Sequence, residues 1–71
     1  MREDRFIKKV GNNIKKQREI IGLTQEDVDS HGVSYKHLQK IEAGRTNTTL
    51  RMLYRLAKAL DCKVRDFFNS E

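Results

Sequence analysis

Apolar residues recur along most of this chain at intervals of three and four, the spacing that places them on one face of an α-helix. In the first such segment, Ile7, Val10, Ile14 and Ile21 form one apolar stripe, and Gly22 follows as a natural C-terminal stop. The Val, Ile and aromatic residues are scattered rather than alternating, and the sequence contains no Pro. The pattern predicts an all-α fold.

Polar residues that cap helices divide the middle of the chain. Thr24 is followed by Glu26 and Asp27, which are favoured in the first turn of a helix, so a second helix is expected there. Ser34 is the candidate N-cap of a third helix. That helix ends at Gly44, because glycine readily adopts the left-handed conformation that follows a helix.

Two further helices complete the predicted fold. Thr48 or Thr49 starts the fourth helix. Its buried face is expected to consist of Leu50, Leu53, Leu56, Ala57 and Leu60. A short fifth helix over about residues 63–69 carries Val64, Phe67 and Phe68. Residues 1–71 are therefore expected to form a single domain of five helices, too small to enclose a large active-site cavity.

The third helix presents two different faces. At about 100° per residue, Leu38 and Ile41 point together toward the core. The opposite arc offers hydrogen-bond donors, two charges and one small residue, and consists of Lys36, Gln39, Lys40 and Ala43. Such a face is built either for contact with a partner or simply for water.

Charge distribution favours a negatively charged partner. Residues 34–58 carry six Lys and Arg residues against a single acid, Glu42, and so account for the whole net charge of +5. A basic segment of this kind suits a polyanion such as nucleic acid, although a merely solvated Lys-rich face is the alternative.

Several other classes are disfavoured by the sequence. No apolar run approaches the ~20 residues that span a bilayer, and no signal peptide precedes the polar start MREDR, so a soluble, cytoplasmic protein is expected. His31, His37 and Cys62 lack the spacing of a metal site. No nucleophile elbow, phosphate-binding glycine loop or paired-carboxylate site is present. We therefore expect no enzymatic activity, metal or cofactor, and a core role for Cys62.

Four stretches together resemble one known family. LTQEDV, GVS, IEAGR and TLRMLYRLAKALDC occur in the order typical of Cro/repressor-type helix-turn-helix regulators, also called the xenobiotic-response-element (XRE) class. The resemblance covers about residues 7–68. It implies a lambda-repressor-like domain whose third helix, about residues 34–43, lies in the major groove of double-stranded DNA. A sequence-specific transcriptional regulator is then expected, acting as a homodimer on a palindromic operator.

The same resemblance assigns contacts to individual residues. Candidates for contact with base edges are Tyr35, Lys36, Gln39 and Lys40. Candidates for contact with phosphates are Thr24, Gln25, Ser34, Arg45, Asn47 and Thr49. For Gln25 the alternative is an ordinary exposed residue, and for Arg45 and Asn47 it is turn chemistry alone.

Two pairs have expected structural roles. The family often pairs the acid at the position of Glu42 with an arginine of the first helix, here Arg18; an ion pair is favoured over a base contact by Glu42. Phe67 and Phe68 are the expected seat of a dimer interface, with one ring in the core and the other exposed. Burial of both rings within one monomer is the alternative.

The sequence also departs from the family pattern. One residue is missing before Gly32, so the second helix should be cut short or its turn rebuilt around Ser30 and His31. Asp61 replaces a frequent glycine, and Thr48 a frequent proline. Neither replacement lies on the expected DNA-binding face.

Two alternative functions remain open. In the first, the same fold is a protein-interaction module, and the basic face only confers solubility. RNA binding is disfavoured because Tyr35 is the single candidate for stacking on a base. No separate sensor domain is recognised, so control by protein level or by a partner is expected in preference to a small-molecule ligand.

Overall fold

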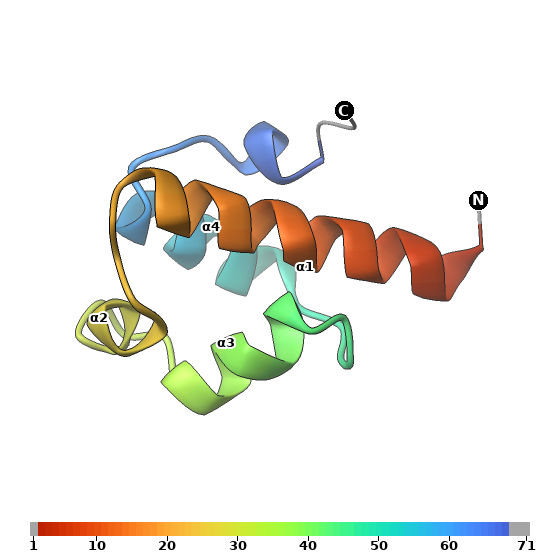
Figure 1. Ribbon diagram of the computed structural model, residues 1–71, viewed down its shortest axis with the longest axis horizontal. Helices are drawn as coiled ribbons and strands as arrows, with labels where there is room; N and C mark the ends of the chain where they lie inside the picture. The colour runs from red at the N-terminus through yellow and green to blue at the C-terminus, as the bar shows by residue number, and fades with distance from the viewer. Residues whose placement is uncertain (1, 69–71) are drawn as a thin grey trace.

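The computed structural model describes residues 2–68, and over this range it contains helices but no strand (Figure 1). The elements are α1 (Glu3–Ile20), α2 (Gln25–Asp29), α3 (Tyr35–Glu42), α4 (Leu50–Ala59) and the 3₁₀-helix η1 (Val64–Phe67). The all-α prediction is therefore confirmed. Among the described helices, none is long and apolar enough to cross a membrane.

The long helix α1 organises the arrangement. In Figure 1 it runs across the molecule with η1 above it, α3 below it and α4 behind it. The contacts given by the structure agree, because α1 packs on both α3 and η1, while α2 packs on α3 and α4 on η1. The N-terminal end of α1 projects beyond the other elements, which agrees with a longest dimension of 33 Å.

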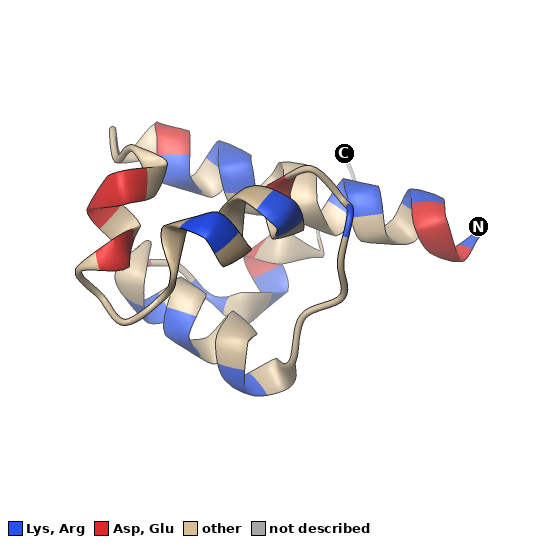
Figure 2. Ribbon diagram, turned by 90° about the horizontal axis from the view of Figure 1, so that it is seen from below, with Lys and Arg blue, Asp and Glu red and all other residues tan. Residues whose placement is uncertain are grey.

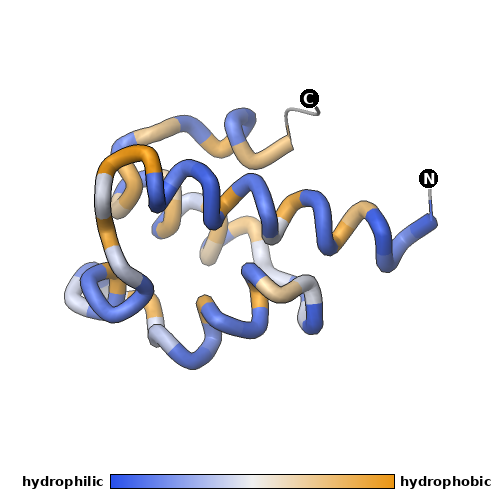
Figure 3. Tube along the Cα trace, viewed as in Figure 1, coloured by the Kyte–Doolittle hydropathy of each residue, from blue (hydrophilic) through white to orange (hydrophobic). Residues whose placement is uncertain are grey.

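All five helices contribute to one core. Hydrophobic and hydrophilic positions alternate along α1 in Figure 3, as expected for a helix buried on one side. The fully buried side chains are Ile14, Val28, Val33, Leu38, Leu56, Leu60 and Phe67. Each contributes about 1.5–3 kcal/mol by leaving water. Cys62 is half-buried against this core, as predicted for a small apolar residue.

Two predicted core positions are wrong. Leu50 is 83% exposed, because it is the first residue of α4. It lies outside the buried face of this helix, which includes Leu53 and Leu56. Ile21 is 43% exposed, because α1 ends at Ile20 and the residues after it no longer follow the helical repeat that defines the apolar stripe.

The predicted fifth helix is also shorter and tighter than expected. Only Val64–Phe67 are helical, as a 3₁₀ turn, and residue 69 of the predicted range lies outside the described residues. Phe67 is completely buried, whereas Phe68 is 44% exposed. The two rings are thus divided between core and surface, as expected.

Three helices end in the same hydrogen-bonded motif. After α1, the N–H of Gly22 bonds to the carbonyl of Glu19 and the N–H of Leu23 to that of Arg18, at 3.0 and 3.1 Å. The ends of α3 and α4 repeat this pattern, with Gly44 and Asp61 in the position of Gly22. The motif requires a left-handed residue, and the three have φ angles of 75°, 71° and 56°.

Helix α2 is short, and its turn is tight, as the missing residue predicts. Thr24 and Asp27 form a capping box in which each side chain accepts the other's backbone N–H, at 3.1 and 2.8 Å. The helix ends after five residues, and Ser30–Gly32 form the turn, with Gly32 at φ 85°. These bonds lower the pKa of Asp27, which therefore stays ionised and keeps its capping role at neutral pH.

The left-handed conformation of Asp61 predicts a stabilising substitution. Asp61→Gly should raise the free energy of unfolding by about 1 kcal/mol, since glycine adopts φ > 0 without steric cost. In a domain of this size the thermal midpoint should rise by about 4–8 °C, as measured by circular dichroism. Asp61→Ala is the control, because it also removes the charge but keeps a Cβ atom, and an equal gain from both variants would contradict the explanation.

Candidate nucleic-acid interface

The outward face of α3 carries the predicted base-contacting residues. Lys36, Gln39 and Lys40 are exposed and Tyr35 is half-buried, while Leu38 and Ile41 anchor the opposite side of the helix in the core. Viewed from below, the molecule shows basic segments on α3 and on its neighbours (Figure 2). Acidic segments are most visible on α2 and at the N-terminal end of α1. The structure therefore offers donors and positive charge on the face of α3 turned away from the core.

Three of the predicted phosphate contacts are helix caps. Thr24, Ser34 and Thr49 are the N-caps of α2, α3 and α4, and each hydroxyl accepts a backbone N–H of its own helix, at 3.0–3.4 Å. A hydroxyl that accepts such a bond keeps its own proton for donation to another acceptor. These side chains can therefore fix the helix ends and still bind an anion.

A buried ion pair joins α1 to α3. Arg18 donates from Nε to Oε2 of Glu42 at 2.8 Å and from Nη2 to Oε1 at 2.9 Å, which is the bidentate geometry of a strong pair. Arg18 also donates from Nη1 to the carbonyl of Leu23 at 2.7 Å. The hydrogen bond with Glu42 raises the pKa of Arg18 even though burial opposes the charge. The predicted ion pair is present, and Glu42 is held within the protein.

The same carboxylate also holds Gln25. The Nε2 atom of Gln25 donates to Oε1 of Glu42 at 2.9 Å, so the half-buried side chain is fixed at the N-terminus of α2. An amide nitrogen has two hydrogens, and one of them remains for another acceptor. The pattern of residues alone did not reveal this bond, because it joins positions 17 residues apart through side chains.

The loop after α3 presents the remaining predicted contacts. The residues Arg45, Asn47 and Thr49 are exposed. The backbone N–H of Arg45 donates to the carbonyl of Lys40 at 2.9 Å and so caps the end of α3. Among residues 2–68, the ion pair found is Arg18–Glu42, so the guanidinium of Arg45 has no acid bound to it there. The positive charges of Arg45 and α3 are thus free to meet a ligand.

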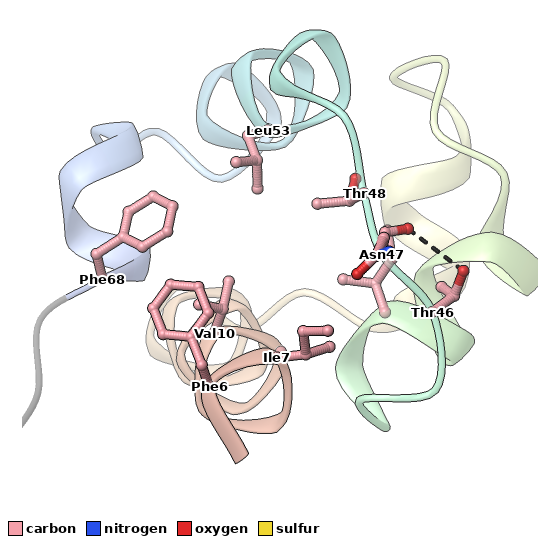
Figure 4. Close-up of a pocket in the computed structure, with 10 residues that line it drawn as sticks. Phe6, Ile7, Val10, Thr46, Asn47, Thr48, Leu53 and Phe68 are labelled. Atoms are coloured by element: carbon pink, nitrogen blue, oxygen red, sulfur yellow. Dashed lines mark hydrogen bonds between the residues drawn. The ribbon is translucent and has the colours of Figure 1, made fainter. Parts of the chain in front are cut away.

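An apolar pocket of about 210 Å³ lies on another side of the molecule (Figure 4). The rings of Phe6 and Phe68 stack at one end, with centroids 6.1 Å apart, and Thr46 and Asn47 lie at the other. Sequence reasoning missed the role of Phe6, an apolar residue outside the main stripe of α1. The pocket has no arrangement of groups suited to catalysis.

Other reactive chemistry is scarce in the part of the chain that the structure describes. No group of three His, Cys, Asp or Glu side chains there could hold a metal ion. Partial burial, together with the nearby carboxylates of Asp66 and Asp61, raises the pKa of the Cys62 thiol. Cys62 therefore stays a neutral thiol beside the core.

Comparison with known proteins gives consistent results. A family model with the description "Helix-turn-helix" (HTH_3) matches residues 14–67. The chain is 46% identical over 54 residues to an uncharacterized HTH-type transcriptional regulator, y4dJ, of Sinorhizobium fredii, covering 75% of this chain and 70% of that protein. It is 34% identical over 58 residues to another, MJ0272, of Methanocaldococcus jannaschii, covering 80% and 88%.

A solved structure shares the arrangement of helices. The restriction-modification controller protein C.AhdI from Aeromonas hydrophila superposes with a TM-score of 0.83 at 30% sequence identity. The match covers 87% of this chain and 96% of that one.

The buried ion pair predicts a large loss of stability on removal of one partner. Glu42→Gln should lower the free energy of unfolding by about 3 kcal/mol, because the charge of Arg18 then stays buried without its counter-ion. Urea unfolding followed by circular dichroism measures the difference. Glu19→Gln, an exposed change on α1, is the control and should be close to neutral. Equal midpoints for the two variants would contradict the assigned role.

Proposed function

Because the chain belongs to the HTH_3 helix-turn-helix family, we propose that it is a transcriptional regulator that binds a specific sequence of double-stranded DNA. The observation that carries the proposal is the exposed, donor-rich face of α3, which the buried side of the same helix holds firmly against the core. A helix of this size fits the major groove of B-DNA.

In this proposal the exposed face of α3 reads the bases. Lys36 and Lys40 donate to O6 and N7 of guanine, and Gln39 pairs with adenine. Tyr35 contacts a thymine methyl group or a phosphate. The small side chain of Ala43, exposed at the C-cap of the same helix, allows the DNA to approach closely.

Contacts with phosphates set the register of α3 in the groove. Gln25 lies at the N-terminus of α2, where free N–H groups and the helix dipole favour an anion. The other proposed phosphate contacts are Thr24, Ser34, Arg45, Asn47 and Thr49. They lie at the starts of three helices and in the loop after α3, so they surround α3.

We also propose that two copies bind together on a palindromic site. One domain of this size makes few base contacts, and a dimer doubles them on half-sites about one helical turn apart. Phe67 is buried in the core, so Phe68 is the ring available to a partner. It stacks on Phe6, which is 47% exposed, and the two form an apolar patch suited to a second copy.

Selection from a random library of duplex DNA at about 0.15 M salt tests the function. Enrichment of a palindrome supports a specific dimeric regulator and gives the spacing of its half-sites. Retention without enrichment overturns sequence-specific recognition. No retention favours the alternative, a protein-interaction module of the same fold.

Two single variants separate reading of bases from contact with phosphates. Lys36→Ala should relax base preference at one position, with a loss of about 1–3 kcal/mol of discrimination there. Arg45→Ala should weaken all sequences alike and reduce the slope of log K against log salt by about 0.9. Repeating the selection measures the base preference of each variant, and titrations at several salt concentrations measure the slope. Identical effects of the two changes would refute these roles.

The dimer proposal predicts that Phe68→Ser gives a monomer, because it removes half of the stacked aromatic patch while Phe67 stays in the core. Sedimentation velocity measures the mass of the variant. Ile20→Ser is the matched control, since Ile20 is 72% exposed at the other end of α1 and should leave the dimer intact. An unchanged dimer mass for Phe68→Ser removes this interface from the proposal.

A further inference from the structure

We propose that α1 also binds the DNA backbone, through Lys8 and Lys15, at the side of the groove that the C-terminal end of α3 approaches. The inference rests on the proposed function, and it adds residues that neither the base-reading helix nor the caps include. Two lysines on the longest helix would then clamp a strand that the helix-turn-helix itself does not reach.

The placement of α1 against α3 is the first support. Gly11 lies so close to the backbone of α3 that a Cβ atom there would overlap the carbonyl oxygen of Ile41. The backbones of the two helices are therefore in direct contact at this point, with no room for a side chain between them. The side of α1 that holds Gly11 faces the last turn of α3.

Lys8 and Lys15 lie on the same side of α1 as this contact. They are three residues before and four residues after Gly11, spacings that keep side chains on one helix face. Both are exposed. A separation of seven positions corresponds to about 10 Å along the helix axis, so the two lysines can meet different phosphates.

The structure locates each lysine beside a proposed DNA contact. The stem of Lys8 packs on Gly44, next to Arg45, so closely that a side chain at Gly44 would collide with it. Lys15 lines a shallow groove together with Gln25 and Gln39. The two lysines thus extend the surface already assigned to phosphates and bases.

Among residues 2–68, three acids lie near these lysines, and none of them forms an ion pair with either one. Asp4, one turn before Lys8, lines the same surface hollow as Lys8 but is not bound to it. Neither Lys8 nor Lys15 makes a hydrogen bond or ion pair within residues 2–68. Glu42 lies in the same groove as Lys15, but both of its oxygens bind Arg18. Glu19, one turn after Lys15, is exposed and forms no ion pair with it. Both ammonium groups are therefore available to an anion.

The dimensions of DNA explain why these contacts would go to the backbone. The major groove is about 12 Å wide, which admits one α-helix but not two packed side by side. With α3 in the groove, α1 must lie outside it, above the bordering strand. Long lysine side chains on the α3 side of α1 then reach phosphates rather than bases.

A matched pair of double variants tests the proposal. Lys8→Gln with Lys15→Gln removes two charges but keeps the stems that pack on the protein. Lys9→Gln with Lys16→Gln removes the same charge with the same seven-residue spacing, turned by about 100° away from α3. Circular dichroism verifies that both variants remain folded.

The readout is affinity for the duplex recovered from the selection, measured by fluorescence anisotropy at several salt concentrations. Loss of two phosphate contacts should make the slope of log K against log salt shallower by about 1.8. If the variant and the unaltered chain bind equally at 1 M salt, this change of slope makes the Lys8 and Lys15 variant bind roughly 30-fold more weakly than the unaltered chain at 0.15 M. The Lys9 and Lys16 variant should lose less than about threefold.

The outcomes separate the inference from the function on which it rests. Equal losses in the two double variants overturn the role of α1, because net charge alone would explain them, and leave the regulator proposal in place. Absence of duplex binding by the unaltered chain overturns both. A shallower slope confined to the Lys8 and Lys15 variant establishes α1 as a DNA-contacting element.

Discussion

The ion pair between Arg18 and Glu42 is the interaction on which the presentation of α3 depends. It ties α1 to the last turn of α3, and further hydrogen bonds extend it to Leu23 and to Gln25. The cost of burying two charges is offset because both carboxylate oxygens and three guanidinium nitrogens are bonded. A five-residue helix such as α2 is too short to be stable alone, so this network and the core together hold it in place.

A second constraint acts beside the ion pair. Gly11 allows the backbone of α1 to touch that of α3, and any side chain there would push the helices apart. Arg18 lies two turns further along the same helix, so such a displacement would also pull it from Glu42. The lack of a side chain at Gly11 and the buried ion pair therefore together fix how α3 packs on α1. The angle at which α3 faces outward follows from both.

Much of the fold could be predicted because its signals are local. N-caps at Thr24, Ser34 and Thr49 and stops at Gly22 and Gly44 depend on neighbouring backbone groups, which the sequence displays directly.

Exposure at helix ends was harder to predict. Periodicity assigned Leu50 to the core, because an apolar arc does not reveal where neighbouring elements stop covering the helix. The bond between Gln25 and Glu42 and the stacking of Phe6 on Phe68 were beyond reach for a similar reason. Each joins residues distant in sequence, and its geometry exists only once the helices are packed.

The completion of the core by Phe67 has a consequence for synthesis of the protein. Asn13 donates from Nδ2 to the carbonyl of Phe67 at 2.9 Å, across 54 positions, and the Phe67 ring is fully buried. A chain still on the ribosome exposes the apolar stripe of α1 for the several seconds that translation of those residues takes at 5–20 residues per second. Small helical domains fold in microseconds to milliseconds. The interval in which chaperones or proteases can capture this protein is therefore set by the pace of translation rather than by the speed of folding.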